Sequence, residues 1–417
     1  MNKLKIAMLT TFYPPYSFGG DAMGVERLAT ALAGQGHQVT VIHDIDAFTT
    51  LSNAKPAERS PQENVEVIGL RSNIGFISNL LTHQLGRPVI HRSQLRSILS
   101  PGAFDIIWFH NISLIGGPAL LSYGDGLKVY EAHEHWLVCP THVLWRHNQE
   151  LCDARQCLRC SVSYRRPPQL WRHHKFFEQQ LGHVDTFIAK SEFSRSKHKE
   201  FGFPKEMEVV PYFLPDKEDN KDVDSSPPHS RPFFLFVGRL EKIKGLDDVI
   251  PVFANYPEAD LLIIGTGEYE ATLKQQAAEI PNVKFLGRLA PEALSRYYES
   301  AIALIVPSVC YETFGIILIE SFREGTPVIA RKIGPFVEIV EQSKGGFLYS
   351  DTEELVDAMS KLHNDSSFRD SMAESARSSF EKYWSEKAVL NNYLGKVRQA
   401  ALAKGNSHVA SALQQEI

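Results

Sequence analysis

Two glutamates, Glu312 and Glu320, lie eight residues apart in the segment SVCYETFGIILIESFREGTPVIA. A short turn at 313–315 separates Glu312 from apolar residues that predict a helix from about Ile316 to Arg323. The N–H groups at the start of such a helix bind anions, a diphosphate among them, and carboxylates accept hydrogen bonds from sugar hydroxyls. The segment therefore predicts a site for a nucleotide diphosphate sugar. The alternative is that Glu312 and Glu320 are two solvated acids on one helix face, since their spacing alone would be the same.

A second pair of residues has the chemistry to bind phosphate. In FVGRLEKIKGLDDVI, Arg239 follows a predicted strand and Lys244 comes five residues later. A guanidinium binds phosphate oxygens through two parallel hydrogen bonds, and an ammonium adds a point charge. Together they would stabilise the negative charge that develops on a leaving nucleotide diphosphate. The alternative is a pair of solvated basic residues beside a turn.

Two glycine pairs follow predicted strands. Gly19 and Gly20 precede a predicted helix, where glycines let backbone amides approach a phosphate; an ordinary turn would explain this pair equally well. Gly265 and Gly267, in IIGTGEY, lack the third glycine of a dinucleotide fingerprint and lie outside the first strand–helix turn. We therefore do not expect NAD to bind there.

Short apolar runs alternate with helical patterns along the chain and must position these residues. The first half contains KIAMLTTF, QVTVIHDI, VEVIGL, FDIIWFH, LKVYEAHE and VDTFIAKS, and the second half contains PFFLFVGR, ADLLIIGTG, VKFLGR, AIALIVPS and TPVIARK. Buried strands that alternate with helices are typical of parallel, doubly wound sheets. We therefore predict an α/β fold of two Rossmann-like domains that face each other across a ligand-binding cleft.

The length of 417 residues exceeds what one ordinary core supports and favours two domains. We predict an acceptor-side domain at 1–213, with a Cys-rich insertion at 139–160, and an exposed polar linker at 214–232. A donor domain is predicted at 233–385, and residues 386–417 are predicted as a helix that packs back on the first domain.

The composition is that of an ordinary soluble protein, with 43% hydrophobic and 22% charged residues. No apolar run reaches the roughly 18 residues of a membrane-spanning helix. The N-terminus, MNKLKIAMLTTFYPP, lacks the long apolar core and cleavage site of a signal peptide. A cytoplasmic location is therefore expected, and the inner face of the plasma membrane is an alternative.

The segment around Glu312 and Glu320 resembles the donor motif of glycosyltransferase family 4, and the resemblance covers nearly the whole chain. Members of this family are retaining glycosyltransferases of the GT-B fold. The resemblance implies a hexosyltransferase that takes its sugar from a nucleotide diphosphate sugar, in polysaccharide or lipid-linked glycan biosynthesis. The acceptor, a glycan or a lipid-linked molecule, stays unidentified. No cofactor is expected to be required for transfer, because Arg239 and Lys244 take the place of a metal at the diphosphate.

The resemblance also assigns roles to residues. Catalytic roles are implied for Glu312, Arg239, Lys244 and His133, which matches a family histidine that approaches the donor sugar from a strand end. The residues implied in donor binding are Gly19, Gly20, Arg239, Lys244, Leu286, Glu312, Phe314, Gly315, Ile316 and Glu320. His110 is another polar residue at a strand end, and a satisfied buried histidine is the plainer interpretation for it.

Four of the five cysteines are clustered: Cys139, Cys152, Cys157 and Cys160. Four thiolates suit a tetrahedral structural Zn²⁺, and the last two form a C-x-x-C pair. The polar residues between them have too little apolar content to fold alone, which favours a metal. An iron–sulfur cluster, disulfide pairs and unligated thiols are the alternatives.

The segment SYRRPPQLWRHHKFF follows the cysteines and combines basic with aromatic residues. Residues 141–205 hold twelve Lys and Arg and six Asp and Glu, a local charge of +6, whereas the whole chain carries −5. A basic, aromatic helix can lie at an anionic lipid surface, or it can pack its aromatic residues inward. Because the rest of the chain is acidic, nucleic acid is not an expected partner.

Two other functions fit parts of the pattern. A sugar nucleotide epimerase would share the fold, while a phosphorylase would need a pyridoxal phosphate lysine for which no candidate is present. A non-catalytic nucleotide-sugar-binding protein is the second alternative, and the intact set of Glu312, Glu320, Arg239 and Lys244 argues against it.

Overall fold

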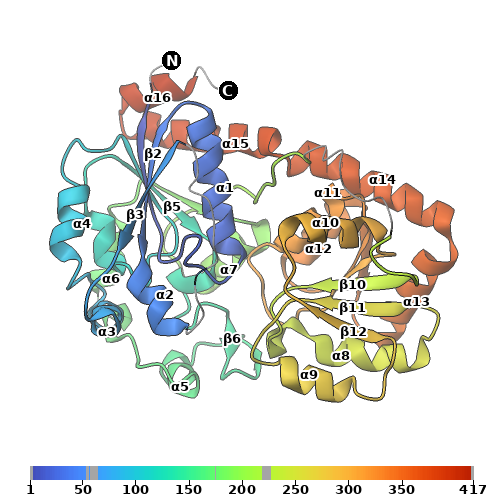
Figure 1. The fold of residues 1–417 in the computed structure, drawn as a ribbon. Coiled ribbons are helices and arrows are strands. Elements are labelled where there is room, and N and C mark those ends of the chain that lie inside the picture. The colour runs from blue at the N-terminus through green and yellow to red at the C-terminus, as the bar shows by residue number, and fades with distance from the viewer. Residues whose placement is uncertain (1–2, 53–55, 57–63, 174, 218–226, 415–417) are drawn as a thin grey trace. The chain divides into compact units, whose positions relative to one another are not determined.

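The computed structural model describes residues 3–52, 56, 64–173, 175–217 and 227–414. The chain divides into two compact units (Figure 1). Unit 1 comprises Met1–Phe213 and Val389–Ile417, and unit 2 comprises Leu214–Ala388. Each unit contains one parallel sheet with helices around it, which confirms the predicted α/β class with two doubly wound sheets.

Unit 1 is built on a seven-stranded sheet in the order β3-β2-β1-β4-β5-β8-β9, with parallel pairing throughout. Its strands are β1 (Lys5–Leu9), β2 (Gln38–Asp44), β3 (Val65–Leu70), β4 (Ile106–Phe109), β5 (Leu127–Ala132), β8 (Thr186–Ala189) and β9 (Glu208–Val209). Its α-helices are α1 (Gly20–Gly34), α2 (Ile45–Leu51), α3 (Gly75–Leu85), α4 (Arg92–Ile98), α5 (Cys157–Ser163), α6 (Lys175–Leu181), α7 (Glu192–Glu200), α15 (Glu386–Ala403) and α16 (Ser407–Gln414). Short 3-10 helices are η1 (Pro118–Ser122), η2 (His135–Leu137) and η3 (Leu170–His173). An antiparallel hairpin of β6 (Trp145–Arg146) and β7 (Glu150–Leu151) lies among the clustered cysteines.

Unit 2 is built on a six-stranded parallel sheet in the order β12-β11-β10-β13-β14-β15. Its strands are β10 (Phe233–Val237), β11 (Asp260–Ile264), β12 (Val283–Gly287), β13 (Leu304–Val306), β14 (Val328–Arg331) and β15 (Gly346–Tyr349). Its helices are η4 (Lys242–Lys244), α8 (Leu246–Val249), η5 (Ile250–Asn255), α9 (Glu270–Gln276), α10 (Pro291–Ser300), α11 (Ile316–Arg323), α12 (Pro335–Ser343), α13 (Thr352–Asn364) and α14 (Ser366–Tyr383). Figure 1 shows α8 and α9 on one side of β10–β12 and α10–α12 on the other.

Each of the eleven apolar runs that predicted a strand contains one. The central strands β10 and β11 are buried along their whole length, as expected where helices cover both faces of a parallel sheet. The sequence did not predict β6, β7 and β9, which have two residues each, or the edge strand β15. A strand of two residues has too few residues to show a pattern.

The C-terminal helices belong to the core of unit 1. Val389, Tyr393 and Val397 of α15 and Val409 of α16 are buried in one cluster with residues of β1, β2 and α1. Tyr393 lies edge-on against Trp108 of β4, with 5.7 Å between ring centroids. The end of the chain therefore completes the hydrophobic core that its beginning starts.

The polar segment 214–232 begins within unit 2. Leu214 is fully buried, and its N–H donates to the carbonyl of Trp384 at 3.1 Å. The carbonyl of Leu214 accepts from the N–H of Glu386 at 3.1 Å. The prediction of an exposed linker is therefore wrong at its first residue, Leu214, which is buried and hydrogen-bonded to Trp384 and Glu386. Residues 218–226 of the predicted linker lie outside the described part of the chain.

The turn after β11 depends on a glycine at position 265. Gly265 has a φ of +141°, and a Cβ there would lie 1.8 Å from the carbonyl oxygen of Gly238. Its N–H donates to the carbonyl of Gly287 at 2.8 Å, at the end of β12. The loops that end β10, β11 and β12 therefore pack backbone against backbone at the carboxyl edge of the unit 2 sheet.

We predict that Gly265→Ala lowers the free energy of unfolding of unit 2 by about 3 kcal/mol or more, because it combines backbone strain with a steric overlap. Gly287→Ala is the matched control: its φ is +70°, but a Cβ there meets no atom within 4 Å. Strain alone should cost about 1–2 kcal/mol at Gly287. Urea unfolding followed by circular dichroism measures both. Equal losses would show that the close backbone packing is unimportant.

Candidate functional site

The centre of the candidate site in unit 2 is an ion pair between Lys244 and Glu312. Lys244 Nζ lies 2.6 Å from Glu312 Oε1, and Ser308 Oγ donates to the same oxygen at 3.2 Å. Burial raises the pKa of Glu312, but the Lys244 charge and both hydrogen bonds outweigh it and hold that pKa below its ordinary value. Glu312 is therefore a carboxylate at neutral pH, able only to accept hydrogen bonds.

Arg239 lies in the same electrostatic neighbourhood as this pair. It follows β10, its positive charge contributes to the lowered pKa of Glu312, and its side chain is exposed. Its Nη1 is 2.7 Å from Glu241 Oε1. An exposed pair of this kind contributes little to stability. The guanidinium can therefore exchange Glu241 for an incoming phosphate at small cost.

Helix α11 begins and ends where the sequence predicted. Gly315 caps its N-terminus with a φ of +116°, and a Cβ at Gly315 would lie 2.7 Å from the ring of Phe336. Phe314 is buried and Ile316, the first helical residue, is partly exposed. The positive end of the helix dipole therefore follows Glu312 by four residues, on a turn that only glycine fits.

Glu320 lies within α11, one turn after its start, and is partly exposed. The hydroxyl of Tyr298, a buried residue of α10, donates to Glu320 Oε2 at 3.2 Å. Sequence reasoning did not single out Tyr298 or Ser308. Tyr298 lies in a helix that carried no motif, so its place beside Glu320 became visible only in the fold.

Arg239, Leu286 and Glu312 reach the same edge of the unit 2 sheet. Arg239 follows β10, Leu286 lies at the end of β12 and is partly exposed, and Glu312 follows β13. In a parallel sheet all carboxyl ends lie at one edge, where ligands of doubly wound folds bind. The edge combines cations, carboxylates and a helix N-terminus, a set suited to a diphosphate attached to hydroxyl-rich groups.

His133 of unit 1 lies in a buried polar cluster. Its Nε2 is 2.8 Å from His110 Nδ1, and its Nδ1 is hydrogen-bonded to the Tyr212 hydroxyl. Burial lowers the pKa of His110 to about 4 and that of His133 well below its ordinary value. Both imidazoles are therefore neutral, and His133 can exchange hydrogen bonds but carries no charge at neutral pH.

Glu131 and Lys190 form a fully buried ion pair beneath the histidines. Glu131 Oε1 contacts Lys190 Nζ and accepts from the Tyr393 hydroxyl at 2.7 Å. His110 Nδ1 is 3.7 Å from Glu131 Oε2. Burial raises the pKa of Glu131, but Lys190 and the two histidines bring it down to about 2. Sequence reasoning missed this pair, although a charged residue within or directly after an apolar strand was a usable signal.

Gly19 and Gly20 take their expected place after β1, at the start of α1. Gly19 is the N-cap in an extended conformation, and Gly20 is already the first helical residue. The helix therefore already includes Gly20, which the sequence placed before it. A Cβ at Gly19 would meet only Asp21 Oδ1, at 3.6 Å, so the backbone there is open to a ligand.

The four clustered cysteines come together around the β6–β7 hairpin and the start of α5. Burial raises the pKa of Cys152 to about 11, with smaller contributions from its neighbours Cys139, Cys157 and Cys160. The N–H of His147 donates to Cys160 Sγ at 3.4 Å. No disulfide joins them. Among the described residues, two groups of three His, Cys, Asp or Glu side chains have metal-ligand atoms that all lie within 4.8 Å of one another. Neither group contains a cysteine.

The basic, aromatic segment after the cysteines packs inward. Trp171 is buried and its Nε1 donates to the carbonyl of His83 at 2.9 Å. The guanidinium of Arg172 lies 5.0, 4.7 and 5.4 Å from the ring centroids of Trp136, Trp171 and Phe177. Of the two interpretations of this segment, the structure supports the inward one. Within the described residues no helix is long and apolar enough to span a membrane.

The sequence models of two families match adjoining parts of the chain. The model described as "Glycosyltransferase Family 4" matches residues 18–216, and that described as "Glycosyl transferases group 1" matches residues 217–379. An uncharacterized glycosyltransferase of Methanocaldococcus jannaschii is 24% identical, with 91% of this chain and 94% of that protein aligned. A phosphatidyl-myo-inositol mannosyltransferase of Mycobacterium leprae is 26% identical, with 89% and 92% aligned.

Two solved structures have a similar fold. Sucrose-phosphate synthase from Thermosynechococcus elongatus has a TM-score of 0.69 at 18% identity and covers 96% of this chain and 100% of its own. The Anabaena protein HepE, solved in complex with UDP-glucose, has a TM-score of 0.65 at 19% identity, covering 99% and 100%. These likenesses confirm the predicted GT-B fold.

We predict that Lys190→Met and Glu131→Leu each lower the free energy of unfolding by about 3–5 kcal/mol, since each leaves one buried charge without its partner. The double variant Lys190→Met/Glu131→Leu leaves neither and should lose clearly less than the sum of the two. Urea unfolding monitored by tryptophan fluorescence measures this, because four of the five tryptophans lie in unit 1. Additive losses would show that the two charges do not depend on each other.

Proposed function

The chain belongs to glycosyltransferase family 4 and is a glycosyltransferase of the GT-B type, and we propose that it transfers a sugar from a nucleotide diphosphate donor with retention of anomeric configuration. The observation that carries the proposal is the Lys244–Glu312 ion pair beside Arg239, with the N-terminus of α11 and Glu320 following along the chain.

In this proposal the donor diphosphate lies against Arg239, Lys244 and the start of α11. Lys244 has three N–H donors, so it can keep Glu312 and still bind a phosphate oxygen. As the bond from the anomeric carbon to phosphate breaks, the sugar becomes oxocarbenium-like and the departing diphosphate gains charge. Arg239, Lys244 and the backbone amides around Phe314 and Gly315 stabilise that charge. No metal is required for this step.

The carboxylates position the donor in this proposal. Glu312 is ionised and accepts hydrogen bonds from hydroxyls of the sugar, and Glu320, held by Tyr298, accepts them from the ribose. The acceptor hydroxyl attacks from the face that the diphosphate leaves, and a phosphate oxygen takes its proton. The HepE structure contains UDP-glucose, which supports a nucleotide-sugar donor for this chain.

His133 acts as a neutral hydrogen-bonding group in this proposal. Its contact with a donor hydroxyl requires that the sugar replace either Tyr212 or His110 at one ring nitrogen. A lipid-linked acceptor is part of the proposal, because the Mycobacterium leprae relative is named for a phosphatidyl-myo-inositol substrate. Turnover of the donor distinguishes this function from a non-catalytic binding protein.

The donor proposal predicts that one of UDP, GDP and ADP raises the melting temperature of the protein. A nucleotide at ~100 times its dissociation constant adds about 2.7 kcal/mol of stability. Glu320→Ala should remove most of this shift, and Lys244→Ala should remove most of the transfer activity while the protein stays folded. Glu341→Ala and Lys242→Ala, exposed charges on α12 and η4, are matched controls. Wild-type rates in Lys244→Ala would contradict the site assignment.

We also propose that Cys139, Cys152, Cys157 and Cys160 hold a structural Zn²⁺. The pair Cys157 and Cys160 opens α5, Cys152 directly follows β7, and the hairpin N–H of His147 already points at Cys160 Sγ. A short hairpin joined to a helix that starts with two cysteines has little apolar core of its own, so a metal would supply its stability.

The zinc proposal predicts one bound zinc per chain by elemental analysis of protein purified without added metal. Cys157→Ser should lose most of the metal and lower the melting temperature, because a three-thiol set binds Zn²⁺ more weakly. Cys310→Ser is the control, since Cys310 is a buried cysteine of unit 2 outside the cluster. Protein that is free of zinc and iron yet equally stable would leave the cysteines as unligated thiols.

A further inference from the structure

Helix α3 has its polar side chains inside and its apolar side chains outside. Ser78, Asn79 and Thr82 are 2–4% exposed. Phe76 is 65% exposed, Ile77 is 47% exposed and Leu80 is 39% exposed. Phe76 and Ile77 lie four and three residues before Leu80, the two spacings that bring side chains together on one helix face, so these three form an outward apolar surface. A surface helix normally has the opposite arrangement.

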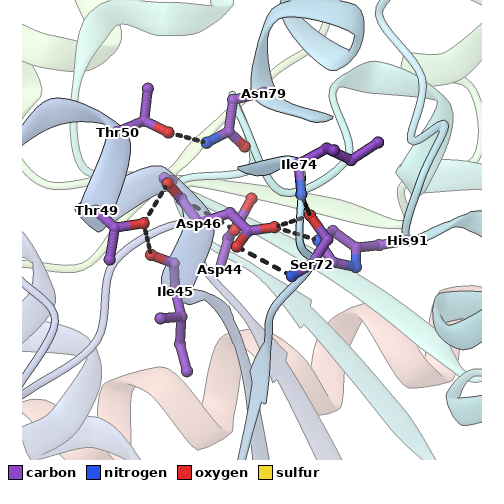
Figure 2. A network of polar contacts seen from close by, with 10 residues as sticks. Asp44, Ile45, Asp46, Thr49, Thr50, Ser72, Ile74, Asn79 and His91 are labelled. Carbon is purple, nitrogen blue, oxygen red and sulfur yellow. Dashed lines mark hydrogen bonds and ion pairs between the residues drawn. The ribbon is translucent and has the colours of Figure 1, made fainter. Parts of the chain in front are cut away.

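A buried polar network holds α3 in this orientation (Figure 2). Asn79 Nδ2 donates to Thr50 Oγ1 of α2 at 3.3 Å. The carboxylate of Asp46 accepts from the N–H and the hydroxyl of Ser72, at 3.0 and 2.6 Å, and its Oδ2 is 3.0 Å from His91 Nε2. Ser72 precedes α3 and His91 follows it. The network therefore ties down both ends of the segment, and turning the apolar face inward would leave these polar groups unsatisfied.

The apolar surface continues beyond the helix in both directions. Ile74 lies before α3, Leu85 ends it, and Val89 and Ile90 follow, each of them 36–47% exposed. We call this set the α3 surface: Ile74, Phe76, Ile77, Leu80, Leu85, Val89 and Ile90. Exposed apolar residues gathered on one segment in this way mark an interaction site.

The charged residues of the segment that carries the α3 surface have one sign. Residues 67–104 contain no Asp or Glu and four arginines, Arg71, Arg87, Arg92 and Arg96, all of them exposed. The α3 helix itself has no Asp, Glu, Lys or Arg, so the cations lie at its two ends. The whole chain carries −5, and this segment therefore departs from the rest in both charge and polarity.

We propose that the α3 surface inserts into the interface of an anionic lipid bilayer. An apolar helix face buries its side chains at the boundary between headgroups and acyl chains, and the flanking arginines bind lipid phosphates. A second copy of this chain fits less well. A two-fold contact through the α3 surface would bring the same four arginines together, and like charges across an interface are repelled.

This inference does not depend on the proposed transfer reaction. Lipid binding requires only unit 1, whereas the donor residues lie in unit 2. The nucleotide-induced change in melting temperature and the binding to vesicles are therefore separate measurements, and either one can fail without the other.

The test is co-sedimentation of the full chain with vesicles of phosphatidylcholine containing ~30% phosphatidylglycerol, and with vesicles of phosphatidylcholine alone. We expect the wild-type protein to bind the anionic vesicles and to lose binding at high salt. Phe76→Ser/Ile77→Ser should reduce the partition coefficient by about tenfold or more, which corresponds to about 1.4 kcal/mol. Arg71→Gln/Arg92→Gln should weaken binding to anionic vesicles only.

The control is Phe368→Ser/Leu402→Ser, which removes a phenylalanine and an aliphatic residue that are 41% and 54% exposed on α14 and α15. It should bind vesicles like the wild type. Melting temperatures show that every variant is folded. The proposal is wrong if wild-type protein stays in the supernatant, or if the α3 variant binds as the control does. A dimer that Phe76→Ser/Ile77→Ser abolishes, detected by light scattering without lipid, would identify a second copy as the partner instead.

Discussion

Parallel pairing in both sheets is the constraint on which the chemistry of this protein depends. When all strands of a sheet run the same way, the residues that follow them are brought to one edge regardless of their distance in sequence. In unit 2 this brings Lys244, after β10, within 2.6 Å of Glu312, after β13. In unit 1 it brings His110, after β4, within 2.8 Å of His133, after β5. Strand order brings the loops to one edge, and in unit 2 the two loops also pack against each other, since the N–H of Val309 donates to the carbonyl of Ile243 at 2.9 Å.

The strands and the helix α11 were predictable from sequence because their signals are local. A fully buried strand is an unbroken apolar run. Helix α11 directly follows Gly315, whose positive φ favours glycine. The places of Glu312, Glu320, Arg239 and Lys244 in the fold were predictable because each lies beside such a signal. The contact between Lys244 and Glu312 was not, since pairing across two adjacent strands follows from sheet order, which an apolar run does not encode.

Most residues that the sequence did not reveal have partners far away in the chain. Glu131, in β5, meets Lys190, which directly follows β8, and Tyr393 from the C-terminal helix α15. A helical pattern likewise shows that a helix has two faces but not which one lies inward, so nothing in the sequence of α3 indicated that its apolar face is exposed. For the aromatic residues near Trp171 the sequence allowed both orientations, and packing on Trp136 and Phe177 decides for the inward one.

The two ion pairs differ in burial, and therefore in whether a ligand can reach them. Glu131 and Lys190 are fully buried, and both contact the Tyr393 hydroxyl of α15. Since an apolar pair can often fill such a space at no greater cost, the contribution of this pair is to hold α15 beside β5. Lys244 and Glu312 are only partly buried. A ligand can reach their unused donor and acceptor positions without unfolding anything around them. The same chemistry of ammonium and carboxylate therefore fixes a helix in unit 1 and stays available for exchange in unit 2, and the difference lies in access to solvent.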